Sequence, residues 1–143
     1  MKQKIDIPEM PLRTKTYTIN VEPVSWARAG VRGKGSYKPQ FYDTQVMEKV
    51  AFGLYMQQQH NDEPLFERPI SVDATFFMPI PRSKKDRRGS IFHAHYPDLD
   101  NLLKLLLDSM KPIIVDDRIV SVIHARKIFD PNPRTVFTIT ELQ

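Results

Sequence analysis

A short leucine-rich segment between two prolines constrains the fold of this chain more than any other feature. Asp98 follows Pro97 and begins a run that reaches Met110, and Pro112 then prevents a helix from continuing. Because Asp is favoured at helix N-termini, we expect a helix over Asp98 to Met110. Its five leucines need an apolar partner: Leu102, Leu103, Leu105, Leu106 and Leu107. The segment therefore predicts a helix that packs on a sheet or on another helix.

Strand patterns lie on both sides of this helix. Alternating or β-branched residues predict strands over 17–21, 70–78, 119–129 and 135–141. In the strand over 70–78, every second residue is apolar, and we expect this face to be buried. Its members are Val72, Ala74, Phe76 and Met78.

A further helix is expected earlier in the chain. It would be capped by Asp43 and Thr44 and run to about Gln59, with an apolar face of Val46, Val50 and Leu54 and with Phe52 as a weaker member. The element order is then β-α-β-α-β-β. We predict one α+β domain over residues 1–143, with one mixed sheet of about four strands and two main helices.

Composition narrows the functional classes. The chain has no cysteine, which excludes disulfides and thiolate zinc sites and leaves oxygen or imidazole as metal ligands. A content of 41% hydrophobic and 27% charged residues is typical of a globular protein. Residues 1–14 mix charges with prolines, resemble neither a signal peptide nor a membrane span, and are expected to be flexible. We expect a cytoplasmic protein with no membrane partner.

The net charge of +4 is unevenly distributed. Two segments without apolar periodicity, 26–40 and 80–96, are predicted to be loops and hold much of the positive charge. Such loops are either solvated surface or contacts to phosphate groups. Their basic residues are Arg28, Arg32, Lys34 and Lys38 in the first segment, and Arg82, Lys84, Lys85, Arg87 and Arg88 in the second.

Acidic residues cluster around the leucine-rich helix. Asp98 and Asp100 lie at its start, and a helix that folds back onto the sheet brings Asp117 beside them. Neighbouring carboxylates repel one another unless a cation neutralises them. Mg²⁺ prefers oxygen ligands, keeps several waters and accepts phosphate oxygens. The pattern indicates a magnesium site for cutting a phosphodiester.

Lys104 lies four residues after Asp100, on the same helical face, where its ammonium group can approach a phosphate or the carboxylates. A purely structural interpretation is equally compatible with the spacing. In that interpretation Asp100 caps the helix, Lys104 pairs with Asp100 or Asp108, and Asp116 and Asp117 form a turn.

The chain resembles the RusA family of Holliday-junction resolvases at the motif from Pro97 to Lys104, at Asp108 and over residues 116–120. The resemblance runs from the strand end at 76–79, through the loop at 81–85, to the strand that carries Lys127. It implies that Asp98, Asp100 and Asp117 are catalytic carboxylates and metal ligands, and that Lys104 is the essential lysine. Asp116 would be an accessory acid, and Lys127 joins the expected DNA-binding residues.

The resemblance also implies an activity. Members of this family are homodimeric, Mg²⁺-dependent endodeoxyribonucleases that make paired nicks in four-way DNA junctions during recombination and repair and are often encoded by phages. Mg²⁺ is therefore the expected cofactor, and the sequence leaves open whether Mn²⁺ substitutes. A C₂ dimer presents two equivalent sites, which suits the approximate two-fold axis of a junction. Two alternatives remain at this point: a non-catalytic junction-binding protein, and a less selective metal-dependent nuclease that acts on flaps or forks.

Overall fold

The computed structural model describes residues 11–23, 30–32, 40–42, 46–82 and 90–143. Its main sheet has four strands in the order β1-β6-β4-β5. Strands β4 and β5 are parallel, and the other two pairings are antiparallel. The strands are β1 (Thr14–Ile19), β4 (Ile70–Met78), β5 (Val120–Phe129) and β6 (Arg134–Glu141).

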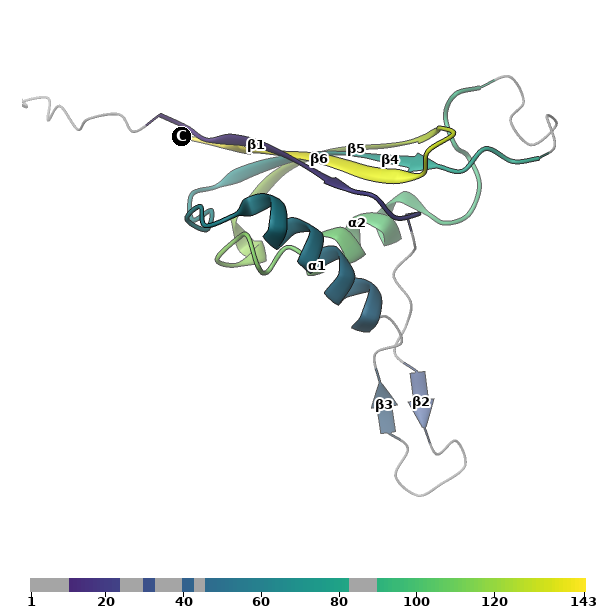
Figure 1. The fold of residues 1–143 in the computed structure, drawn as a ribbon, viewed down its shortest axis with the longest axis horizontal. Coiled ribbons are helices and arrows are strands. Elements are labelled where there is room, and N and C mark those ends of the chain that lie inside the picture. Colours follow the sequence, from purple (N-terminus) through teal and green to yellow (C-terminus); the bar gives the residue numbers. More distant parts are fainter. Residues whose placement is uncertain (1–10, 24–29, 33–39, 43–45, 83–89) are drawn as a thin grey trace, which may run out of the picture.

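Two helices cover one face of this sheet, as Figure 1 shows. The first helix, α1 (Val46–His60), packs against β1, and the second, α2 (Leu99–Asp108), packs against β5. A 3-10 helix, η2 (Asp117–Ile119), leads into β5. The predicted fold class is confirmed: one α+β domain with two helices and a mixed four-stranded sheet. No helix in the described part of the chain is long and apolar enough to cross a membrane.

The loop predicted over residues 26–40 is wrong at two places. Strands β2 (Gly30–Arg32) and β3 (Gln40–Tyr42) pair antiparallel as a separate two-stranded sheet. Three-residue strands are too short to show an alternating pattern, and the glycines around them mask the signal. The other residues of this segment, and the helix cap predicted at Asp43 and Thr44, lie outside the described residues, as do residues 1–10.

The core lies between the sheet and the two helices. The predicted apolar face of β4 is confirmed, because Val72, Ala74, Phe76 and Met78 are all buried. From α2, Leu102, Leu105 and Leu106 point into the same core, while Leu103 and Leu107 pack at its margin. The other side of α2 faces away from the sheet, and this is the side that carries Asp100 and Lys104 as exposed residues.

The predicted apolar face of α1 is wrong at Val50 and Leu54 and correct at Phe52. Val50 and Leu54 are 51% and 59% exposed, whereas Phe52 and Met56 are 3% and 0% exposed. Apolar residues occur around most of this helix, so helical periodicity alone admits more than one buried face. Packing against the sheet buries Phe52 and Met56. The side chain of Val46 lies outside the described part of the structure.

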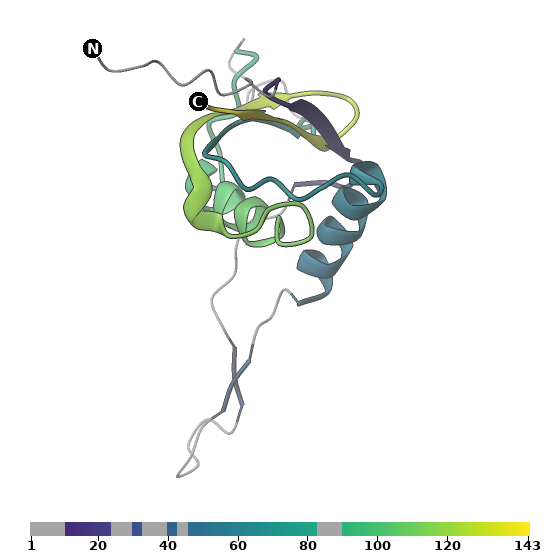
Figure 2. The same ribbon diagram turned by 90° about the vertical axis from the view of Figure 1, so that its left-hand side faces the viewer.

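The opposite face of the sheet carries polar side chains, and no described helix covers it (Figure 2). Arg126 of β5 donates from its guanidinium to Asp73 Oδ1 at 2.8 Å and to Thr75 Oγ1 at 2.7 Å, both on β4. This arrangement is ordinary for a sheet with one solvated face.

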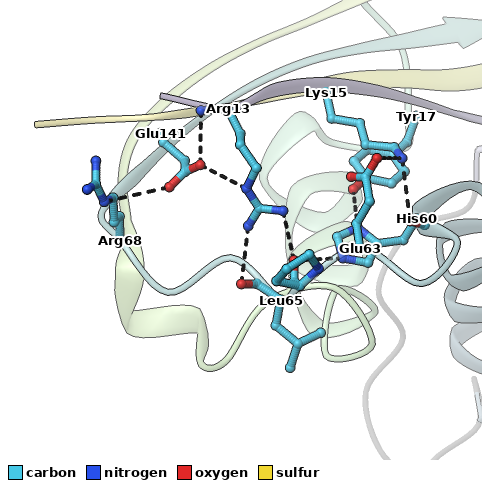
Figure 3. Close-up of polar contacts among 9 residues, drawn as sticks. Arg13, Lys15, Tyr17, His60, Glu63, Leu65, Arg68 and Glu141 are labelled. Atoms are coloured by element: carbon cyan, nitrogen blue, oxygen red, sulfur yellow. Dashed lines mark hydrogen bonds and ion pairs between the residues drawn. The ribbon is translucent and has the colours of Figure 1, made fainter. Parts of the chain in front are cut away.

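A polar cluster joins both ends of the chain at the β1 side of the sheet (Figure 3). Arg13 donates through Nε to Glu141 Oε1 at 2.9 Å and through its terminal nitrogens to the carbonyls of Pro64 and Leu65 at 2.8 and 3.2 Å. Arg68 lies 3.9 Å from the other oxygen of Glu141. The Glu141 side chain is only 9% exposed, so these contacts balance a nearly buried charge.

Candidate active site

The first turn of α2 positions two of the predicted acids. Asp98 is the N-cap residue, with extended backbone (φ −71°, ψ 146°), and its side chain makes no capping hydrogen bond. The Oδ1 atom of Asp100 accepts a hydrogen bond from the backbone N–H of Asn101 at 3.0 Å. Both acids are exposed. The helix macrodipole favours negative charge at its N-terminus, so α2 stabilises both carboxylates.

A hollow of about 360 Å³ brings three of the four predicted catalytic residues together. Asp100 and Lys104 line it from α2, and Asp117 lines it from η2. Asp98 is not part of the lining. The other lining residues are one further acid, Asp108, and four apolar residues: Leu103, Leu107, Val120 and Ile123. The fold therefore places three carboxylates and one ammonium group, from α2 and η2, around a single hollow at the β5 edge of the sheet.

Asp117 lies between this hollow and a smaller one of about 270 Å³, which Asp108 and Asp116 also line. The Oδ1 atom of Asp116 accepts a hydrogen bond from the backbone N–H of Arg118 at 2.9 Å and so caps η2. The hydrogen bond from the Arg118 amide is the main reason that the pKa of Asp116 lies below its usual value. A hydrogen bond with the carboxyl group of Asp117 lowers this pKa further. Asp116 therefore stabilises the turn that presents Asp117.

The donor set at the hollow suits a hard cation. Among the described residues, no group of three or more Asp, Glu or His side chains lies close enough together to hold a metal ion. Mg²⁺ usually binds through only one or two carboxylates and keeps its remaining waters. Asp100 and Asp117 line one hollow and offer carboxylate oxygens, so they fit Mg²⁺ as a two-carboxylate site. The structure does not gather Asp98 into this pair.

Lys127 makes contacts that the sequence does not indicate. Its Nζ atom donates to the carbonyl oxygens of His95 at 2.9 Å and Pro97 at 2.8 Å. Burial lowers the pKa of Lys127, and the charge of Asp98 acts in the opposite direction. Asp98 therefore lies within electrostatic reach of Lys127. No sequence pattern around a lysine on a strand predicts hydrogen bonds to backbone carbonyls about 30 residues away.

Most of the predicted DNA contacts fall outside the described residues. Arg82 is exposed and follows the end of β4, and Arg32 is the last residue of β2, although its side chain is not described. The structure describes none of the other basic loop residues: Arg28, Lys34, Lys38, Lys84, Lys85, Arg87 and Arg88. DNA binding by these residues stays a prediction.

A nuclease is the class of protein that suits a fold with acids and a lysine around one exposed hollow. The family model described as "Endodeoxyribonuclease RusA" matches residues 20–140, and the chain belongs to this family. It is therefore an endodeoxyribonuclease, a hydrolase of DNA.

Two relatives match along most of the chain. A protein of Lactococcus phage r1t named "Crossover junction endodeoxyribonuclease rusA" is 28% identical over 130 residues, which cover 88% of this chain and 95% of the relative. The uncharacterized protein YqaN of Bacillus subtilis (strain 168) is 26% identical over 138 residues, with the same coverage.

Proposed function

We propose that this endodeoxyribonuclease resolves Holliday junctions as a homodimer, with Mg²⁺ as its cofactor, by paired symmetric nicks. The observation that carries the proposal is the shared hollow of Asp100, Lys104 and Asp117 in a chain of the RusA family. The name of the phage relative supports a four-way junction as the substrate. The two-fold symmetry of a junction supports a C₂ dimer with one site in each protomer.

The residues around the hollow have distinct roles in this proposal. Asp100 and Asp117 bind the cation through carboxylate oxygens. Asp98, the N-cap residue of α2, does not line the hollow. When bound, Mg²⁺ supplies Lewis-acid activation of the scissile phosphate and of the attacking water. Lys104 lies one helical turn from Asp100, where its ammonium group contacts a phosphate oxygen and balances the charge that develops during cleavage.

The basic loop residues have a separate role, because a cluster of carboxylates repels DNA. In this proposal the arginines and lysines of the loops neutralise backbone phosphates and position the DNA without reading its sequence. Replacing Arg87 and Arg88 with alanine should weaken junction binding and make the dependence of log K on log salt less steep by roughly one per residue. Gel-shift titrations at several salt concentrations measure this slope, and an unchanged slope would place the two arginines away from the phosphates.

A labelled four-way junction tests the activity directly. In Mg²⁺ or Mn²⁺, the wild-type protein should cut two opposite strands at symmetric positions. Asp100→Asn and Asp117→Asn should each lower the rate by at least about 100-fold, as expected when a group that stabilises the transition state is removed, while junction binding in EDTA persists. Asp62→Asn provides a matched control, because Asp62 is an exposed acid in the turn after α1. No cleavage by the wild-type protein with either metal would refute the proposal.

Three further measurements test the paired nicks, the dimer and the preference for junctions. A supercoiled plasmid with an extruded cruciform should yield mainly linear product, because paired nicks within one encounter break both strands. Mainly nicked circles would indicate independent cuts. Light scattering should give twice the monomer mass of 16.7 kDa. Equal rates on junction, flap and fork substrates would remove the resolvase assignment and leave a less selective nuclease.

A further inference from the structure

We propose that Lys127 is a positioning residue of the nuclease site, because its ammonium group holds the backbone that leads into Asp98 and α2. The inference rests on the proposed function, since a positioning role has meaning only if Asp98 and Asp100 act on DNA. It assigns Lys127 a role other than the phosphate contact that the sequence predicts.

The geometry around the ammonium group is specific. Lys127 pairs in register with the buried Phe76 of β4, so its side chain lies on the helix-covered side of the sheet. From there Nζ reaches the carbonyl oxygens of His95 and Pro97, at 2.9 and 2.8 Å. These two carbonyls flank Tyr96, and the second belongs to the residue directly before Asp98. A single side chain on β5 thus holds residues 95–97, which lead into the N-cap Asp98 of α2.

The ammonium group is poorly placed to contact phosphate. Two of its three N–H donors are directed at neutral carbonyl oxygens, which accept strongly from a charged donor. The charge of Asp98 also acts on the ammonium group and raises the pKa of Lys127, against the effect of burial. A lysine on the DNA surface would instead be hydrated and mobile. These contacts favour a role within the protein over a role in DNA binding.

The segment before Tyr96 is attached by other means. The backbone N–H of His93 donates to the carbonyl of Lys127 at 3.1 Å, and the N–H of Phe129 donates to the carbonyl of Ile91 at 2.9 Å. The ring of His93 packs on Phe129, with centroids 5.2 Å apart. None of these contacts uses the Lys127 side chain. Replacing that side chain should therefore release the entry to α2 while residues 91–93 stay on β5.

The experiment compares Lys127→Met and Lys127→Arg with Arg126→Met as the matched control. Arg126 is the neighbouring basic residue of β5, but it faces the uncovered side of the sheet and bonds to Asp73 and Thr75. The single-turnover cleavage rate at saturating protein should fall roughly 10- to 100-fold in Lys127→Met, as for other residues that orient a site through their neighbours. Lys127→Arg, which keeps donors for both carbonyls, should recover most of the rate. Arg126→Met should match the wild-type protein.

Two readouts separate positioning from DNA contact. Junction affinity in EDTA and its salt dependence should be unchanged in Lys127→Met. Amide hydrogen exchange of a peptide spanning residues 94–101 should be faster in Lys127→Met and normal in the other two variants. Should Lys127→Met fail to fold, Lys127→Gln replaces it with the same expected results, because its side chain is one atom shorter and cannot span both carbonyls.

The opposite outcome would overturn the proposal. Weaker junction binding, a less steep salt dependence and unchanged exchange would assign Lys127 to a phosphate. Hydrogen exchange needs no DNA, so it tests the hold of Lys127 on the segment even if the wild-type protein fails to cut a junction. If exchange is faster in Lys127→Met but the wild-type protein cuts no junction, the hold of Lys127 on the segment is supported and the proposed function is refuted.

Discussion

Arg13 offers the sharpest test of how the two ends of the chain are held together. Its side chain makes three hydrogen bonds, one to Glu141 and two to the carbonyls of Pro64 and Leu65. Arg13→Ala removes all three and leaves the Glu141 carboxylate, which is 9% exposed, with weaker partners. Those that remain are the backbone N–H of residue 13 at 2.9 Å and Arg68 at 3.9 Å.

The size of the effect follows from these contacts. Removing one partner of a buried ion pair typically costs about 3–5 kcal/mol, because the other charge is left uncompensated. Two partners of Glu141 remain, so we expect a loss of about 2–3 kcal/mol in the free energy of unfolding. For a chain of this length, that corresponds to a decrease in Tm of roughly 8–12 °C.

Urea and thermal unfolding followed by circular dichroism measure the loss. Arg68→Ala is the control, because Arg68 is more exposed and lies farther from Glu141, so its removal should cost less than about 1 kcal/mol. The double variant Arg13→Ala/Glu141→Gln should be more stable than Arg13→Ala, since it removes the unpaired charge. Equal, small losses for Arg13→Ala and Arg68→Ala would refute the reasoning. Cleavage should be unaffected, because β1 and β5 are opposite edges of the sheet.

Three further predictions concern packing, pH and metal. Met56→Ala should destabilise the protein by about 2–5 kcal/mol and Leu54→Ser by no more than about 0.5 kcal/mol, as urea unfolding can measure. A hydrogen bond from Arg126 lowers the pKa of Asp73, so the stability that Asp73 contributes should be present above pH 4 and disappear as the pH falls through its lowered pKa; wild-type and Asp73→Asn unfolding curves should then converge in acid. EDTA should abolish cleavage reversibly and leave the urea midpoint unchanged, because the core is held by apolar packing; a large shift would assign the metal a structural role.

Local patterns predicted much of this fold, for identifiable reasons. Every second residue from Val72 to Met78 is apolar, and a sheet with helices on one face buries every second side chain of such a strand. The prolines around α2 limit its length, and its leucines bury the predicted side. The prediction for α1 is wrong at Val50 and Leu54, because these two residues are as apolar as Phe52 and Met56, which the sheet buries. Only the position of the helix over β1 determines which of these apolar residues are buried.

The sequence likewise predicts some features of the candidate site and not others. Asp100 and Lys104 share a face because they are one helical turn apart, which the sequence states directly. Their approach to Asp117 needed the correct prediction that α2 folds back onto the sheet. The bonds of Lys127 to two carbonyls depend on side-chain direction and strand register, which no local pattern contains. The pairing of Arg13 with Glu141 joins residues 128 positions apart, and neither residue has a neighbouring motif that indicates it.

The place of α2 between two parallel strands has a consequence during synthesis. A ribosome releases β4 first, then the helix with Asp98, Asp100 and Lys104, and only afterwards Asp117 and β5. Strand β5 must align beside β4 before Asp117 and Lys127 reach the start of α2. An incomplete nascent chain therefore lacks the assembled site, and cutting ability appears only when the edge of the sheet closes.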